Sequence, residues 1–127
     1  MFAILVVDDQ AQLRDSICMT LNLAGYRVHT AGTGIEALAI LQSQQINLII
    51  TDIEMPQLDG HQLCRIVRAD DRWNAIPLLF LSAHGDDEDV RYAQNLGADA
   101  YLLKPIEPEA LLAAVGLWLF ARAHPEQ

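Results

Sequence analysis

The 127-residue chain has few of the features that would point to a disulfide-bonded, metal-thiolate or membrane protein. Its two cysteines, Cys18 and Cys64, lack the CxxC spacing of zinc and redox motifs, so two buried thiols in a reducing compartment are expected. No apolar stretch approaches the roughly 18 residues of a transmembrane helix, and no basic segment precedes the first apolar run as in a signal peptide. These absences favour a cytoplasmic protein with no membrane partner.

Positive charge is also scarce. The chain has 8 basic and 17 acidic side chains, which gives a formal net charge of −9. Binding to nucleic acid or to an anionic membrane without sequence specificity requires a cationic surface, so direct nucleic-acid binding is not expected. The surplus of carboxylates favours a protein that holds cations, although much of it serves only solubility.

Short apolar runs alternate regularly with longer segments of helical pattern. Strands are expected at 2–7, 26–31, 47–51, 77–82 and 100–103. Three of them are apolar almost throughout, as parallel strands covered on both faces should be. Helices are expected at 11–25, 33–44, 60–70, 86–99 and 108–123. This alternation predicts a single α/β domain over residues 1–127, a doubly wound five-stranded parallel sheet with five helices.

Local signals mark the ends of two of these helices and the buried side of a third. Thr33 is a candidate N-cap, and Gly97 is a candidate helix end. The helix at 11–25 is expected to bury one apolar stripe formed by Leu13, Ile17, Leu21 and Leu23.

Polar residues at the ends of four expected strands form the main functional signal. Asp8 and Asp9 follow the first strand, Asp52 the third and Lys104 the fifth, while Ser82 ends the fourth. Ligands of open α/β sheets bind beyond the carboxyl ends of the strands, so these side chains should converge. Crowded carboxylates are tolerable around Mg²⁺, and an ammonium and a hydroxyl suit a phosphoryl group. Asp52 is then left as the carboxylate nucleophile.

Four stretches, VVDD, IITDIEMPQLDG, FLSAHG and GADAYLLKP, resemble the receiver domains of two-component response regulators in their order and spacing. The resemblance covers essentially the whole chain and implies a flavodoxin-like sheet of order 2-1-3-4-5. It implies that Asp52 accepts phosphate and that Lys104 binds the phosphoryl group. It also implies that Asp9 binds Mg²⁺ directly and Asp8 through water, with the backbone carbonyl of Glu54 completing the protein's ligands.

The same resemblance assigns roles to residues around this site. Ser82 would be the switch hydroxyl, and Tyr101 the switch aromatic whose rotamer reports phosphorylation. The bond before Pro105 is expected to be cis. Glu54 and His84 occupy variable positions that help to set the lifetime of the phosphate, the alternative being that both are solvated and without effect.

The leading hypothesis is therefore a Mg²⁺-dependent phosphorelay switch whose only enzymatic activity is its own phosphorylation and dephosphorylation. Its expected partners are a sensor histidine kinase or phosphotransfer protein and an unknown effector. A haloacid dehalogenase-like phosphatase with Asp52 as nucleophile is the alternative, but that family has Asp where this chain has Glu54, and its acidic pair lies downstream. A flavodoxin-like cofactor binder is disfavoured because the loop DDQAQLR is acidic and lacks glycine.

The last helix carries a candidate partner surface. Its core side is expected to be formed by Leu111, Leu112, Val115, Trp118 and Leu119. Leu117 and Phe120 then point away from the core, one turn apart, where a solvated helix should be polar. Receivers often associate through the fourth helix, fifth strand and fifth helix, so the resemblance implies a possible homodimer through this face.

Overall fold

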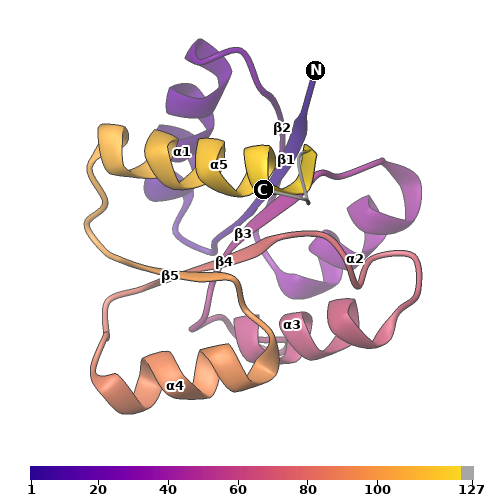
Figure 1. The fold of residues 1–127 in the computed structure, drawn as a ribbon, viewed down its shortest axis with the longest axis vertical. Helices are drawn as coiled ribbons and strands as arrows, with labels where there is room; N and C mark the ends of the chain where they lie inside the picture. Colours follow the sequence, from indigo (N-terminus) through magenta and orange to yellow (C-terminus); the bar gives the residue numbers. More distant parts are fainter. Residues whose placement is uncertain (124–127) are drawn as a thin grey trace.

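Residues 1–123 are described by a computed structural model and form alternating strands and helices (Figure 1). Their order is β1 (Ala3–Val7), α1 (Ala11–Leu23), β2 (Arg27–Ala31), α2 (Gly34–Ser43), β3 (Leu48–Asp52), α3 (Gly60–Ala69), β4 (Leu78–Ser82), α4 (Asp87–Leu96), β5 (Ala100–Leu103) and α5 (Pro108–Ala123). All strand pairs are parallel, in the order β2-β1-β3-β4-β5, which confirms the predicted topology. Within residues 1–123, no helix has the length and hydropathy to cross a membrane.

The sheet lies between two helical layers. One core cluster packs α1 and α5 against one face, and the other packs α2, α3 and α4 against the opposite face (Figure 1). β1, β3 and β4 are buried along their whole length, because helices cover both of their faces. The continuous apolar runs in the sequence are explained by this double cover.

The expected helix ends are found at the predicted residues. Thr33 caps α2, its hydroxyl accepting a hydrogen bond from the backbone N–H of Glu36 at 3.1 Å. Gly97 ends α4 with a φ of 101°, in the left-handed region that glycine enters without steric cost. Both local signals therefore predicted structure correctly.

Two burial predictions for α1 were wrong. Ile17 and Leu21 are buried, but Leu23 is 83% exposed. Leu23 lies two positions beyond Leu21, which is about 200° around the helix and therefore on the opposite side. Cys18 is only half-buried for the same reason, since it follows Ile17 by about 100°, whereas Cys64 is buried as expected.

The start of α3 is held tightly against the end of β3. The Gly60 N–H donates a hydrogen bond to the carbonyl of Ile53 at 2.8 Å. A Cβ atom at Gly60 would lie 2.8 Å from the Ile53 Cα and would also clash with the Asp52 carbonyl. Only glycine allows this approach, which fixes the backbone directly after Asp52.

The burial pattern of α5 matches the one predicted. Of the five residues predicted to face the core, Leu111, Val115 and Leu119 are buried, and Leu112 and Trp118 are partly buried and pack against the same cluster. Leu117 and Phe120 are exposed, at 62% and 53% respectively.

Candidate functional site

The carboxyl edge of the sheet positions the predicted polar residues. The backbone ladder continues beyond β1, where the Asp8 N–H donates to the Ala31 carbonyl at 3.1 Å. It also continues beyond β5, where the Lys104 N–H donates to the Ser82 carbonyl at 2.8 Å. Asp52 is itself the last residue of β3. These side chains therefore leave a rigid sheet rather than free loops.

The Lys104 ammonium lies between two buried carboxylates. Its Nζ is 3.3 Å from Asp8 Oδ2 and 3.2 Å from Asp52 Oδ1. It also donates a hydrogen bond to Gln10 Oε1 at 3.2 Å. Lys104 thus offsets part of the negative charge at this edge through two ion pairs, and Gln10 is a neutral hydrogen-bond acceptor for it.

Burial raises the pKa of the Asp52 carboxyl, and the negative charge of Asp8 raises it further. The positive charge of Lys104 opposes both effects without cancelling them. The ionised form of Asp52 is therefore less favourable in the folded, metal-free protein than in water.

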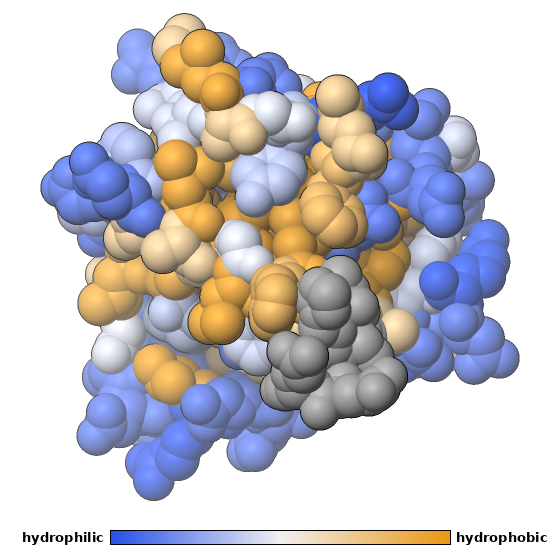
Figure 2. Space-filling model, turned by 45° about the horizontal axis from the view of Figure 1, so that its top comes forward, coloured by the Kyte–Doolittle hydropathy of each residue, from blue (hydrophilic) through white to orange (hydrophobic). Residues whose placement is uncertain are grey.

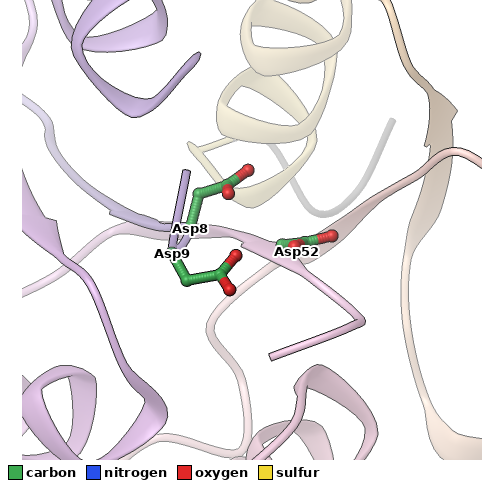
Figure 3. A group of neighbouring side chains, drawn as sticks. All are labelled: Asp8, Asp9 and Asp52. Atoms are coloured by element: carbon green, nitrogen blue, oxygen red, sulfur yellow. The ribbon is translucent and has the colours of Figure 1, made fainter. Parts of the chain in front are cut away.

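The donor set at this edge fits a divalent cation. Carboxylate oxygens of Asp8, Asp9 and Asp52 all lie within 4.8 Å of one another, with Asp9 exposed and the other two buried. The three side chains extend from the ends of β1 and β3 into the same region (Figure 3). Asp8 Oδ2 is buried and accepts no hydrogen bond, despite the nearby Lys104 Nζ. An all-oxygen, anionic site open on one side suits Mg²⁺, which keeps several of its waters.

Glu54 and His84 contact each other beside this site. Glu54 Oε1 lies 3.2 Å from His84 Nε2, and the two side chains are 64% and 68% exposed. Together with Ser82 and Tyr101, they line a cavity of about 250 Å³. The two side chains are thus in contact with each other while both remain largely exposed.

Ser82 and Tyr101 both bond to the loop that follows β4. Ser82 Oγ accepts a hydrogen bond from the His84 N–H at 3.0 Å, and the Tyr101 hydroxyl donates one to the His84 carbonyl. The Tyr101 ring packs edge-on against Phe80, with centroids 6.5 Å apart. The neighbouring Lys104–Pro105 bond is cis. The backbone of His84 therefore links the Ser82 hydroxyl to Tyr101.

The structure gathers the three predicted carboxylates and the lysine in one cluster, with Ser82 on the adjoining strand end. Leu117 and Phe120 lie on α5, which contributes no residue to this cluster. Sequence reasoning missed Gln10, which bonds Lys104, and Arg14, whose Nη1 donates to the Asp8 carbonyl at 3.0 Å. The only signal for Gln10 was its place directly after the acidic pair, at the start of a helix.

Comparison with known proteins gives consistent matches. The family model described as the response regulator receiver domain matches residues 4–116. The probable transcriptional regulator ycf27 of Cyanophora paradoxa is 41% identical over 112 residues, which cover 88% of this chain and 46% of that protein. The DNA-binding dual master transcriptional regulator RpaA of Synechocystis sp. is 38% identical over 112 residues, with 88% of this chain and 46% of that protein covered. The chain spans about half the length of these curated relatives.

Solved structures agree with this result. Chemotaxis response regulator CheY4 of Vibrio cholerae superposes with a TM-score of 0.88 at 35% identity, covering 93% of this chain and 98% of the other. A CheY-like receiver domain protein from Methanospirillum hungatei JF-1 has a TM-score of 0.90 at 29% identity, with 97% of each chain covered. The phosphatase alternative gains no support from these matches. The chain belongs to the response regulator receiver domain family, whose members are phosphoacceptor switches of two-component signalling rather than conventional enzymes.

Proposed function

We propose that Asp52 accepts a phosphoryl group in a Mg²⁺-dependent reaction, within a receiver domain that comprises residues 1–127. The observation that carries this proposal is the position of Asp52 at the end of β3, with Lys104 Nζ 3.2 Å away and two further carboxylates close by. Two of the three carboxylates contact the lysine: Asp8, which belongs to the acidic pair after β1, and Asp52, which ends β3. Asp52 is the one that approaches the lysine from a different strand than the acidic pair. It therefore faces both groups that could act on a phosphoryl group.

The reaction at Asp52 transfers a phosphoryl group from a phosphohistidine to the aspartate. An Asp52 carboxylate oxygen attacks phosphorus, the P–N bond of a phosphohistidine breaks, and the released imidazole takes up a proton. Lys104 binds a phosphoryl oxygen, and the Ser82 hydroxyl binds another. Magnesium, when held by Asp8, Asp9, Asp52 and the Glu54 carbonyl, would neutralise charge on the transferred group. Attack of water on phosphorus later regenerates the carboxylate.

Tyr101 is proposed as the residue that reports this reaction at the surface. Tyr101 lines the cavity that it shares with Ser82 and His84. It also lines a second cavity of about 240 Å³, together with Val90, Ala93 and Gln94 of α4 and with residues 98–100. Tyr101 thus borders two cavities. A movement of Ser82 toward a phosphoryl group would change the His84 loop, to which the Tyr101 hydroxyl is bonded, and so shift the ring between them.

The proposed partners are a sensor histidine kinase or phosphotransfer protein upstream and an effector downstream. The names of two relatives describe transcriptional regulators, and this chain covers less than half of each. The net charge of −9 supports an effect on DNA only through another domain or protein. The cytoplasm is the proposed location, supported by the free thiols of Cys18 and Cys64.

The proposed function is tested by incubating the protein with acetyl phosphate and weighing it. The mass of one phosphoryl group should appear with Mg²⁺ present and should be absent when EDTA removes the metal. The same protein, without a kinase, should then lose the group slowly. Turnover of a generic phosphomonoester without a stable phosphoprotein would instead favour a phosphatase.

The Glu54–His84 pair is expected to slow phosphate loss. Because these side chains meet on the exposed side of the cavity next to Ser82, breaking their contact should admit water more readily. Glu54→Asn and His84→Ala should each accelerate dephosphorylation about two- to fivefold, since an exposed pair contributes at most about 1 kcal/mol. The decay of phosphoprotein mass after removal of acetyl phosphate measures this rate.

The double variant should lose its phosphoryl group no faster than either single variant, because both single changes remove the same contact. Glu88→Asn, an exposed change in the first turn of α4, serves as the control and should leave the rate unchanged. Rates within twofold of wild type in both single variants would mean that Glu54 and His84 have no influence.

Leu117 and Phe120 are proposed to form a surface for self-association. Hydrophobic residues gather across the middle of the face on which α5 lies, with hydrophilic residues around them (Figure 2). Beryllofluoride with Mg²⁺, a mimic of the phosphoryl group, should raise the mass of the wild type measured by light scattering. The variant Leu117→Lys, Phe120→Lys should remain monomeric, because two charges cannot be buried unpaired.

A matched control is available on α1. Met19 and Leu23 are also exposed and one turn apart, so Met19→Lys, Leu23→Lys adds the same charge at another site. This variant should associate as the wild type does. Equal masses for the wild type and the α5 variant in both states would show that this patch is not a self-association surface.

A further inference from the structure

Gln10 connects the end of β1 to the end of β5. It is the N-cap residue of α1, but its side chain makes no capping hydrogen bond. Its Oε1 instead accepts a hydrogen bond from Lys104 Nζ at 3.2 Å, 94 positions away in the sequence. Its backbone N–H donates to Asp8 Oδ1 at 2.8 Å. One residue therefore contacts both the buried acid and the lysine of the site.

Helix capping does not account for this residue. Short polar side chains such as Ser, Thr, Asp and Asn are preferred at the N-cap because their oxygen reaches a nearby backbone N–H. Glutamine is longer, and here its amide oxygen extends to the end of β5 rather than back to α1. The contact with Lys104 is thus the interaction that this side chain makes in place of a cap.

The three residues whose oxygens surround Lys104 Nζ differ in what the reaction does to them. Asp52 becomes an acyl phosphate, so its oxygens lose their negative charge when the phosphoryl group arrives. Asp8 is among the oxygens that would share a metal ion. Gln10 Oε1 is a neutral acceptor that takes no part in the chemistry, so its contact with Lys104 is unaffected by either change.

We infer that Gln10 is a positioning residue for phosphoryl transfer, which holds the Lys104 ammonium at the phosphorylation site while its two carboxylate partners change. This inference rests on the proposed phosphorylation of Asp52. With one N–H held by Gln10, the other donors of Lys104 stay directed toward Asp52 and can bind the oxygens of the incoming group. Without Gln10, Lys104 keeps only the two carboxylate partners that the reaction changes, so more of its ordering must occur during the reaction itself.

The test compares Gln10→Met, which keeps the length of the side chain and removes the acceptor, with Gln10→Glu, which keeps an acceptor. The Mg²⁺-dependent rate of phosphorylation by acetyl phosphate should fall about threefold to tenfold in Gln10→Met, the effect of one lost hydrogen bond. The rate of Gln10→Glu should stay closer to wild type. Gln12→Met, an exposed change in the first turn of the same helix, should have no effect.

A Lys104→Met background separates a role through the lysine from a structural one. There, adding Gln10→Met should cause no further loss of the residual rate. In the metal-free protein, NMR should show faster hydrogen exchange at the Lys104 ammonium when Gln10 is methionine. A wild-type rate in Gln10→Met, or an equal loss in both backgrounds, would overturn the inference and leave the phosphorylation of Asp52 intact. Absence of phosphorylation in the wild type would overturn both.

Discussion

Replacing Asp52 with alanine is expected to abolish phosphorylation by acetyl phosphate. The transfer requires a carboxylate oxygen that can attack phosphorus beside Lys104, and alanine has none. Asp8 is fully buried beneath the lysine, and Asp9 is the exposed member of the pair, so neither replaces Asp52 at the end of β3. Mass spectrometry of the intact protein, with Mg²⁺ present, measures the loss directly.

Asp71→Ala is the matched control, since Asp71 is an exposed aspartate in the loop between α3 and β4. It should gain phosphate at the wild-type rate, which would show that removing an aspartate elsewhere is harmless. Asp52→Asn keeps the shape of the side chain and should also fail to react. Phosphorylation of Asp52→Ala at the wild-type rate would contradict the assignment of the phosphoacceptor.

The positions of the site residues could be predicted from the sequence because they depend on the backbone. Asp8, Asp52, Ser82 and Lys104 each stand where an apolar run ends, and parallel strands place all such ends at one edge. Thr33 could be predicted for a similar reason, since a cap depends on residues only three positions away. Both predictions rest on sequence patterns that either lie within a few residues, as a helix cap does, or recur after each strand, as these polar residues do.

Contacts between side chains from different elements could not be predicted in the same way. The pairing of Glu54 with His84 joins two loops, and that of Gln10 with Lys104 joins opposite ends of the chain. Such contacts depend on rotamers and on the exact separation of the strand ends, neither of which leaves a pattern in the sequence. Leu23 shows the related limit that an apolar residue near a stripe does not have to belong to it.

Magnesium is expected to stabilise the folded protein strongly. Three carboxylates within 4.8 Å of one another repel, and Lys104 offsets only part of their charge. A cation that binds the folded state alone adds about 2.7 kcal/mol at a hundredfold excess over its dissociation constant. For a domain of this size, that corresponds to a rise of about 8–12 °C in melting temperature. Scanning calorimetry with millimolar Mg²⁺ or with EDTA measures it, and Asp9→Ala should lose most of the response.

In EDTA, the raised pKa of Asp52 determines whether the free energy of unfolding rises or falls with pH. Between the ordinary pKa of an aspartate and the raised pKa, the folded protein binds more protons than the unfolded chain does. The free energy of unfolding therefore falls as pH rises through that interval. At neutral pH without metal, Asp52→Asn should be more stable than the wild type, because the crowded charge is gone.

Millimolar Mg²⁺ should reverse that order, because the ion stabilises the wild type and finds one ligand fewer in Asp52→Asn. Urea unfolding of both proteins, with Asp71→Asn as the control, gives the comparison. A wild-type melting temperature that does not respond to Mg²⁺ would contradict the metal site. An Asp52→Asn protein less stable than the wild type in EDTA would show that Lys104 compensates fully for the buried charges. The Asp52 charge would then not destabilise the metal-free protein, and the increase in stability with Mg²⁺ would be the only stability effect that depends on this site.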